Sequence, residues 1–348
     1  MIIVKKEGIL LEKTNYGFES SGVLNPAVFC ENGSCHLFYR AVSKDHYSSI
    51  GYCRLKTPVT VENRMEIPLL YPQYNYEKKG MEDPRIVKID DLYYLTYTAY
   101  DGINALGALA TSKDLVTWEK RGLIVPQYSY EEFKFLAESK GELNEKYFRF
   151  NGKYIVSKKL KKKVLVWDKN VILFPRRING KLYFLHRIKP DIQIVCVDHL
   201  SELTHNFWDN FLLMFGDHIL ISSKYGHEVS YVGGGCPPIE TEKGWLLIYH
   251  GVHDTVEGYV YSACAALLDL KDPTREIGRL PYPLFIPEQS YELHGNVNNV
   301  CFPSGAIAFD DTLYIYYGAA DKHVACASVC LSELLKELTT YKNLSHEK

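Results

Sequence analysis

Residues 243–250 read Lys243-Gly-Trp-Leu-Leu-Ile-Tyr-His250, a turn signal followed by a run of apolar, aromatic and branched residues. Such side chains favour β-strands, and a Gly-containing turn before the run is typical of a hairpin. Four more runs of this kind follow turn signals at Asn32-Gly33, Asp90-Asp91, Asn179-Gly180 and Asp310-Asp311; they occupy residues 35–40, 92–98, 182–187 and 313–317. The sequence therefore predicts five antiparallel hairpins.

A proline stands 12 to 14 residues before the end of each run, and a short strand-like stretch of small residues follows the run. The five prolines are Pro26, Pro84, Pro175, Pro238 and Pro303. Repetition of a multi-strand unit at a period of about 60 residues is the sequence signature of a β-propeller. We predict an all-β fold, a five-bladed β-propeller.

The repeat fills the chain, so we expect a single domain over residues 1–348. The interval from Pro84 to Pro175 is about 30 residues longer than the period, which predicts a rim insertion at about 130–163, near the third blade. Its basic run, Lys158-Lys-Leu-Lys-Lys-Lys163, reads as a solvated face. We expect a C-terminal tail at about 336–348. A division into two domains is the alternative, but no Pro/Ser-rich linker supports it.

The composition restricts the ligand. Forty Lys and Arg against 42 Asp and Glu give a formal charge of -2, so there is no overall positive field to attract nucleic acid or an anionic membrane. The nine cysteines include no Cys-x-x-Cys pair, so we expect reduced thiols in the core rather than disulfides or metal ligands. No stretch approaches the roughly 20 apolar residues of a membrane span. These features predict a cytoplasmic protein that binds a small molecule.

Equivalent positions of the repeat carry polar residues that a purely structural pattern does not require. Inner strand ends of different blades converge at one mouth of a propeller channel. The residues expected there are Asn25 and Asp83 before their prolines, Arg40, Arg187 and His250 at strand ends, and Asp101 and Asp321 after them. Two arginines beside carboxylates predict a site for an anionic or polyhydroxylated ligand, because a guanidinium can bind phosphate or carboxylate through two hydrogen bonds. Phe174 and Phe302, which also precede prolines, are interpreted as structural.

Several segments resemble glycoside hydrolase family 130, in order and over nearly the whole chain. They are Gly80-Met-Glu-Asp-Pro-Arg85, Tyr94-Leu-Thr-Tyr-Thr-Ala-Tyr-Asp101, Leu173-Phe-Pro175 with Leu185-His-Arg187, Gly233-Gly-Gly-Cys-Pro-Pro-Ile239 with Gly244-Trp-Leu-Leu-Ile-Tyr-His-Gly251, and Tyr316-Tyr-Gly-Ala-Ala-Asp321. The resemblance implies a five-bladed propeller and an inverting β-mannoside phosphorylase or, in some members, a β-mannosidase.

The resemblance also implies residue roles. Asp83 corresponds to the general acid, which protonates the glycosidic oxygen through a hydroxyl of the bound mannose. Asn25, Arg40 and Asp321 correspond to positions that hold the mannosyl unit, and Asp101 is a further candidate for substrate binding. Arg187, His250 and Tyr261 correspond to positions that bind phosphate. Two positions depart from the family pattern: Tyr231 stands where a lysine is usual, and Lys169 matches a basic phosphate-binding position only loosely.

The chemistry leaves three functions open. Inversion needs an acid on the leaving oxygen and a nucleophile on the opposite face. A phosphorylase needs one carboxylate and a cationic site for phosphate, which Arg187 and His250 favour, with phosphate as co-substrate and no cofactor or metal. A β-mannosidase needs a second carboxylate as base, for which the candidates are Glu228, Glu240, Asp254 and Glu257. A non-catalytic glycan-binding propeller is the third possibility. A homo-oligomer is an expectation from the family, and the mannosidic linkage stays open.

Overall fold

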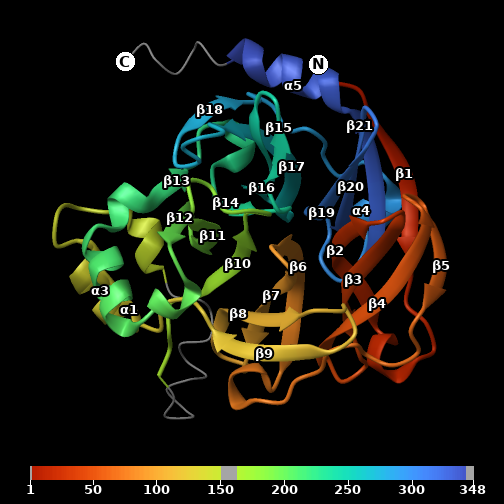
Figure 1. Cartoon of the computed structure of the whole chain (residues 1–348), viewed down its shortest axis with the longest axis horizontal. Helices are drawn as coiled ribbons and strands as arrows, with labels where there is room; N and C mark the ends of the chain where they lie inside the picture. The colour runs from red at the N-terminus through yellow and green to blue at the C-terminus, as the bar shows by residue number, and fades with distance from the viewer. Residues whose placement is uncertain (1, 150–162, 342–348) are drawn as a thin grey trace.

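The computed structural model describes residues 2–149 and 163–341 and is built mainly of antiparallel strands (Figure 1). Strand group I contains β2 (Gly22–Glu31), β3 (Ser34–Val42), β4 (Ser48–Thr57) and β5 (Thr60–Arg64). Group II contains β6 (Gly80–Ile89), β7 (Leu92–Tyr100), β8 (Ala105–Ser112) and β9 (Trp118–Leu123). Group III contains β10 (Asp168–Leu173), β11 (Leu182–Ile188), β12 (Ile192–Val197) and β13 (Ile219–Ile221). The strands of each group are antiparallel.

Groups I, II and III form one continuous sheet, but the joints between them are slight. A single parallel residue pair, Ser48 with Gly80, joins β4 to β6, and another, Leu106 with Asp168, joins β8 to β10. The three groups are therefore separate antiparallel units that touch at one end.

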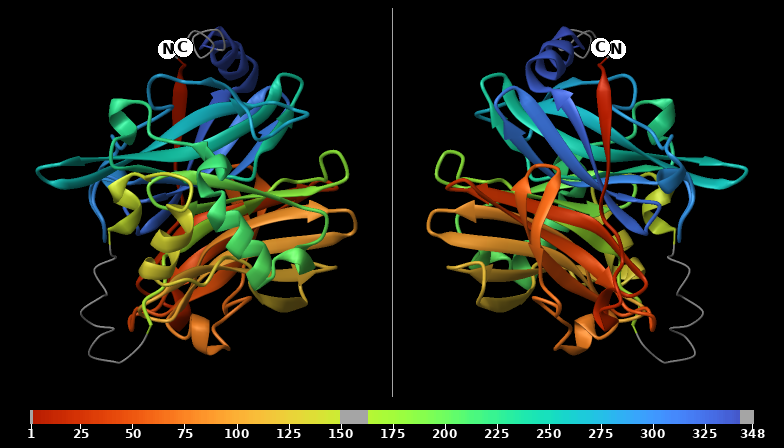
Figure 2. Two further views of the ribbon diagram at one scale, coloured as in Figure 1. Left: turned by 90° about the vertical axis from the view of Figure 1, so that its left-hand side faces the viewer. Right: turned by 90° about the vertical axis from the view of Figure 1, so that its right-hand side faces the viewer.

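The rest of the chain forms two more antiparallel groups. Group IV contains β14 (Tyr231–Gly234), β15 (Ile239–Thr241), β16 (Gly244–Thr255), β17 (Gly258–Leu268) and β18 (Glu276–Arg279). Group V contains β19 (Cys301–Phe309), β20 (Thr312–Ala319) and β21 (His323–Cys330), and its fourth strand is β1 (Val4–Leu11) from the beginning of the chain. Figure 2 shows β1 beside the C-terminal strands. The turn signals in the sequence do connect paired strands, so the predicted hairpins are confirmed.

Helices lie at the outside of the strand groups. They are α1 (Tyr130–Ala137), α3 (His205–Leu213), α4 (Ser290–Leu293) and α5 (Leu331–Thr340). Of the region expected as an insertion, the structure describes α1 and a short 3-10 helix, η3 (Glu145–Phe148). Helix α1 lies beside α3 (Figure 1). Phe133 of α1 contacts Phe215 of the short 3-10 helix after α3 edge to face, with ring centres 5.1 Å apart. The basic run from Lys158 lies outside the described residues, apart from Lys163. Residues 336–340 of the expected tail belong to α5, whose Leu335 and Leu338 are buried.

A fully buried glutamate binds a tyrosine in four of the five groups. The glutamates lie in η1 (Gly17–Glu19), η2 (Asn75–Glu77), η6 (Gly226–Glu228) and α4. Tyr39 donates to Glu19 at 2.8 Å, Tyr97 to Glu77 at 2.9 Å, Tyr317 to Glu292 at 2.6 Å, and Tyr249 to Glu228. A cation from an outer strand pairs with each carboxylate: Arg64, Lys120, Lys6 and Arg279, respectively. We call these four units carboxylate anchors.

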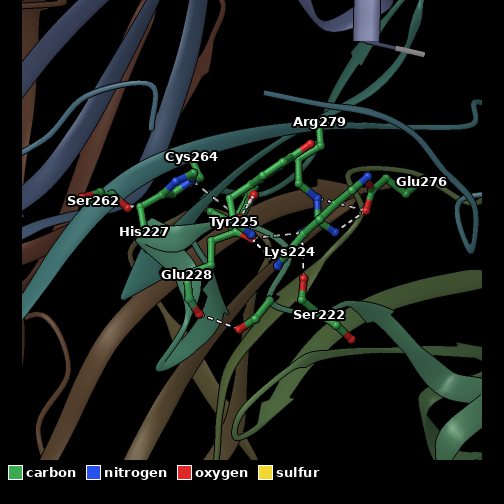
Figure 3. Close-up of polar contacts among 11 residues, drawn as sticks. Ser222, Lys224, Tyr225, His227, Glu228, Ser262, Cys264, Glu276 and Arg279 are labelled. Atoms are coloured by element: carbon green, nitrogen blue, oxygen red, sulfur yellow. Dashed lines mark hydrogen bonds and ion pairs between the residues drawn. The ribbon is translucent and has the colours of Figure 1, made fainter. Parts of the chain in front are cut away.

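Figure 3 shows the anchor of group IV, in which Glu228 accepts the backbone N–H groups of Lys224 and Tyr225 at 2.8 and 3.2 Å and pairs with Arg279 at 3.3 Å. A buried carboxylate is stable only when its oxygens are hydrogen-bonded. Here the interactions tie the turn before η6, β16 through Tyr249 and β18 through Arg279 to one point. Group III has a different anchor at the equivalent strand position, a hydrogen bond of 2.7 Å between His186 of β11 and Asp168 of β10.

The cysteine prediction was wrong for one pair. Cys30 and Cys35 face each other directly across β2 and β3, with Cα atoms 4.1 Å apart, and form a disulfide. Two cysteines at opposed positions of a hairpin have the short separation that a disulfide needs, and their spacing around Asn32-Gly33 contained that information. The other seven cysteines are free thiols.

In the described part of the chain, no helix has the length and apolar character to cross a membrane.

Candidate active site

Three polar side chains leave the sheet from equivalent β-bulges. Asn25, Asp83 and Asn170 lie in β2, β6 and β10 with φ of 48°, 52° and 54°, and the strand register shifts at each of them. Asn and Asp tolerate this left-handed conformation better than other non-glycine residues, and a bulge redirects its side chain out of the regular alternation. The equivalent of Asn25 in group III is therefore Asn170, and the alignment of Phe174-Pro175 with that position was wrong.

These bulges deliver their side chains into a cavity of about 210 Å³, which we call the inner cavity. Seven of the residues that the sequence singled out line it: Asn25, Arg40, Asp83, Lys169, Arg187, Tyr261 and Asp321. His250 is fully buried beside it, with its ring 4.4 Å from that of Phe302. Phe302 itself lines the inner cavity, so its interpretation as purely structural was wrong; the register shift after Pro303 allows the ring to face the site.

Asp83 is held by its neighbours on one side of the inner cavity. Asn25 Nδ2 donates to Asp83 Oδ1 at 2.7 Å, and Arg40 lies 3.5 Å from the same oxygen. Burial alone would raise the pKa of Asp83, but Arg40, Lys169 and Arg85 together with the hydrogen bond from Asn25 outweigh it and lower the pKa below 3.8. Asp83 is therefore a carboxylate at neutral pH.

Glu82 shares these cations. Its two carboxylate oxygens lie 2.8 Å from Arg40 and 3.5 Å from Lys169. Glu82 was not predicted as a site residue, although it directly precedes Asp83. Nothing in the sequence around a glutamate at this position indicates that its side chain is buried. Glu82 therefore sets the positions of two cations that line the cavity.

Asp321 is the second carboxylate that lines the inner cavity. Asp321 is mostly buried, and this burial raises its pKa to about 6. The negative charge of Asp83 raises the pKa further, whereas the positive charge of Arg40 lowers it. Two carboxylates near each other that differ in pKa can divide proton-donating and charge-carrying roles. Asp321 thus exchanges its proton near neutral pH, whereas Asp83 does so only in more acidic solution.

The part of the inner cavity around Arg187 is cationic. Arg187 is 6% exposed, and its Nε has no hydrogen-bond partner among the described residues. Its guanidinium lies 5.4 Å from the ring centre of Tyr231, and Lys189 Nζ lies 3.8 Å from the same ring. Lys189 is exposed, yet desolvation by the surrounding protein, with Arg187 and Lys169 nearby, lowers its pKa. A buried donor without a partner indicates a place for a ligand acceptor.

His250 completes this side as a neutral imidazole. Burial, with Arg187 and Arg85 nearby, holds its pKa well below 6.5. Neither ring nitrogen has a partner within the described ranges. Gly233 makes room for the ring, because a Cβ at this position would lie 2.4 Å from His250 Nε2. Tyr261 donates to or accepts from Tyr231 at 2.5 Å, so the aromatic residue that replaces the usual lysine is part of the site.

A larger outer cavity of about 500 Å³ adjoins the inner one and shares Trp167, Arg187, Lys189 and Tyr231 with it. Lys189 was not predicted, although it lies two residues after Arg187 and so on the same side of an extended chain. Asp101 does not line the inner cavity; its Oδ1 accepts the N–H groups of Ile103 and Asn104 at 2.8 and 2.7 Å.

The candidate bases of a hydrolase lie elsewhere. Glu228 is the centre of an anchor, Glu240 pairs with Arg176 on the surface, and Glu257 is exposed at the tip of the hairpin between β16 and β17. Asp254 lines the outer cavity and accepts from Ser230 at 2.6 Å. Of the residues that the structure describes, only Asp83 and Asp321 bring carboxylates to the wall of the inner cavity.

One cluster in the described residues has the donor spacing of a metal site, namely His227, Glu228 and Cys264, with ligand atoms within 4.8 Å of one another. Glu228 already has an arginine and hydrogen-bond donors on its oxygens, and burial raises the pKa of the Cys264 thiol well above 9.0. The anchors at Glu19, Glu77 and Glu292 have the same form. We therefore assign Glu228 to the fold.

Comparison with known proteins finds relatives that match most of the chain. A family model described as beta-1,4-mannooligosaccharide phosphorylase matches residues 5–167 and 158–340. A 1,2-beta-oligomannan phosphorylase of Thermoanaerobacter sp. (strain X514) is 32% identical over 94% of this chain and 96% of its own. A beta-1,2-mannobiose phosphorylase of the same strain is 33% identical over 92% and 94%. The solved structure of a beta-1,2-mannobiose phosphorylase from Listeria innocua with beta-1,2-mannobiose has a TM-score of 0.71, 26% identity, and coverage of 97% and 99%.

Proposed function

The chain belongs to glycoside hydrolase family 130, and we propose that it cleaves β-mannosides with phosphate and releases α-mannose 1-phosphate with inversion. The observation that carries this proposal is the pairing of one carboxylate-rich wall, at Asp83 and Asp321, with a cationic wall at Arg187 inside one small cavity. The size of the inner cavity suits one sugar ring, and the unpartnered donors suit an anion.

We assign the acid role to Asp83. The carboxyl proton passes to the leaving oxygen, through a hydroxyl of the mannosyl unit, while the bond from C1 to that oxygen breaks. The pKa of Asp83 is low because of its cationic neighbours Arg40, Lys169 and Arg85. Phosphate that binds beside Lys169 brings negative charge to one of these cations, which raises the pKa of Asp83 toward the value that an acid needs.

The sugar is held on the same wall. Asn25, Arg40 and Asp321 surround Asp83 and offer one amide, one guanidinium and one carboxylate to sugar hydroxyls. Such groups give orientation as well as affinity, because a hydroxyl can both donate and accept a hydrogen bond. These contacts present one face of the ring to Asp83.

Phosphate takes the opposite wall, where one of its oxygens attacks C1. Arg187 and Lys169 supply positive charge, and Tyr261, which also lines the inner cavity, offers a neutral hydroxyl. Neutral His250 is fully buried beside the cavity, and we propose it as a further, uncharged partner of the phosphate. A neutral imidazole offers one N–H and does not compete with Arg187 as a cation. The absence of Glu228, Glu240, Asp254 and Glu257 from the described inner wall favours phosphate over water activated by a base.

Two further features belong to this proposal. We take the five strand groups as blades of a propeller in one catalytic domain, with the helical segment around α1 as its insertion; the equivalent bulges of groups I, II and III and the near-equivalent anchors support this. We take β-1,2-linked mannosides as the substrate class, because three relatives that cover more than 90% of the chain are named for that linkage. Cytoplasmic location and homo-oligomeric assembly stay predictions of the sequence.

The test is an assay of β-1,2- and β-1,4-mannobiose with purified protein, in phosphate and in phosphate-free buffer, in which mannose and mannose 1-phosphate are resolved. We expect mannose 1-phosphate to form only with phosphate, and faster from the β-1,2-linked substrate. Release of two free mannose units at the same rate with and without phosphate would show a hydrolase instead.

A further inference from the structure

The hydrogen bond between His186 and Asp168 lies directly behind the cationic wall. Asp168 Oδ2 is 2.7 Å from His186 Nδ1, and both side chains are fully buried. His186 precedes Arg187 in β11, Asp168 precedes Lys169 in β10, and Lys169 is paired with Arg187 in the strand register. Successive side chains of a strand point to opposite faces, so the pair lies on the reverse face from the two cations.

Within the described residues, the side chains of His186 and Asp168 form this hydrogen bond and no other. His186 Nε2 and Asp168 Oδ1 have no partner in the part of the chain that the structure describes, and the rings of Trp208 and Phe211 from α3 lie 5.7 and 5.4 Å from the imidazole. The carboxylate anchors of the other groups differ in this respect, because Glu228 has two backbone N–H donors, a tyrosine and an arginine. The pair of group III is thus a single cross-strand bond in an apolar surrounding.

A buried polar pair of this kind is a poor source of stability, because removal of its groups from water costs free energy that one hydrogen bond does not recover. What the bond does fix is the relative position of β10 and β11 at the point where Lys169 and Arg187 reach the inner cavity. The register of these strands shifts immediately afterwards, between Lys169 and Ile172, so the ladder itself constrains this end weakly.

We propose that His186 and Asp168 are positioning residues for phosphate: their hydrogen bond holds Lys169 and Arg187 at the spacing that phosphate requires. The inference rests on the proposed function, since it takes these two cations as phosphate ligands. Neither His186 nor Asp168 lines the inner cavity. Their effect on phosphate is therefore transmitted through the strands, and a small displacement of such ligands is enough to lower the rate strongly.

The test compares two variants of almost equal size. His186→Leu removes the hydrogen bond, whereas His186→Asn places an amide N–H where Nδ1 lies and restores a donor to Asp168. We expect His186→Leu to raise the KM for phosphate at least tenfold, with inhibition by free mannose unchanged within twofold. His186→Asn should return the KM for phosphate to within about threefold of the wild type.

Tyr97→Phe is the matched control, because it removes the buried hydrogen bond to Glu77 in group II. Tyr97 precedes Thr98 as His186 precedes Arg187, but Thr98 does not line the inner cavity. It should lower thermal stability but leave the KM for phosphate within twofold. If His186→Leu does not fold, the double variant His186→Leu, Asp168→Leu removes the buried carboxylate too and serves the same comparison.

A KM for phosphate within twofold of the wild type in His186→Leu or the double variant would overturn the inference and leave the pair a structural role only. A wild-type protein that shows no phosphorolysis would instead contradict the proposed function. In that case calorimetric titration with inorganic phosphate still compares the variants directly, and equal affinities would overturn the inference separately.

Discussion

Asn25 and Asp83 belong to different strand groups, yet the side-chain amide of Asn25 donates to Asp83 Oδ1 across 2.7 Å. Both residues occupy left-handed positions at bulges, which point their side chains toward the same cavity. The bond leaves the other carboxylate oxygen of Asp83 for a ligand. This side of the inner cavity is therefore assembled from two strand groups, each contributing its equivalent residue.

Replacement of the proposed acid gives the first prediction. Asp83→Asn should lower kcat on unactivated mannobiose by roughly 10²- to 10⁴-fold, because an amide has no carboxyl proton to give to the leaving oxygen. Asn is well suited to the left-handed backbone at this position, so the fold should remain intact by circular dichroism and thermal melting. A variant with most of the wild-type activity would remove Asp83 from the mechanism.

Gly318 is predicted to control the position of Asn25. A Cβ at Gly318 would lie 1.9 Å from Asn25 Oδ1, a distance that requires the amide to move. Gly318→Ala should therefore break the bond to Asp83 and lower kcat/KM for mannobiose at least tenfold. Gly216→Ala is the matched control, because Gly216, like Gly318, has no left-handed backbone, but a Cβ there would meet no atom within 4 Å. Unchanged kinetics in Gly318→Ala would show that the site tolerates a displaced Asn25.

Much of this arrangement was predictable from the sequence. Turn signals and aromatic runs identified the hairpins, and Asn25 and Asp83 were found because a proline follows each of them. Asn170 was missed because Val171 follows it instead, so only the backbone conformation shows its equivalence. Phe302 was misjudged because an aromatic residue before a proline is typical of a core.

The anchors were missed for a different reason. Glu19, Glu77 and Glu228 each stand three residues after a tyrosine, as in Tyr16-Gly-Phe-Glu19, but a lone glutamate in a turn predicts a solvated side chain. Their burial depends on a tyrosine and a cation from elsewhere in the same group, which sequence spacing does not bring together. Lys189 and Glu82 were missed similarly, since their importance comes from the other charges that face them.

The raised pKa of Asp321 predicts a dependence of stability on pH. Its pKa of about 6 in the folded protein exceeds the ordinary value of 3.8, so the folded state binds the proton more tightly. The resulting stabilisation is complete below pH 3.8 and is lost as the pH rises to about 6. Relative to Asp321→Asn, the wild type should lose about 3 kcal/mol over this interval. Thermal or urea unfolding of both proteins from pH 4 to 8 measures the difference, and parallel profiles would contradict the assignment.

The disulfide predicts a thiol count. Unfolded protein prepared without reductant should react with a thiol reagent at seven cysteines, and at nine after reduction, because only Cys30 and Cys35 are bonded. Cys30→Ser/Cys35→Ser should give seven in both conditions. Nine reactive thiols without reduction would show that this pair is reduced, as the sequence analysis expected.

Arg187 provides the sharpest test of phosphate as the nucleophile. Its guanidinium lines the inner cavity, is buried, and has an Nε without a partner among the described residues. Arg187→Ala should raise the KM for phosphate by 10- to 100-fold, since a charge-assisted contact to an anion is roughly twice as strong as a neutral one. Inhibition by mannose should change little, because the residues that we propose as sugar ligands are different ones, namely Asn25, Arg40 and Asp321. Arg187→Lys should recover only part of the loss, since an ammonium lacks the forked pair of donors. Steady-state kinetics with phosphate and mannobiose varied independently separate these effects, and an equal loss of sugar and phosphate affinity would place Arg187 in general support of the site rather than at the phosphate.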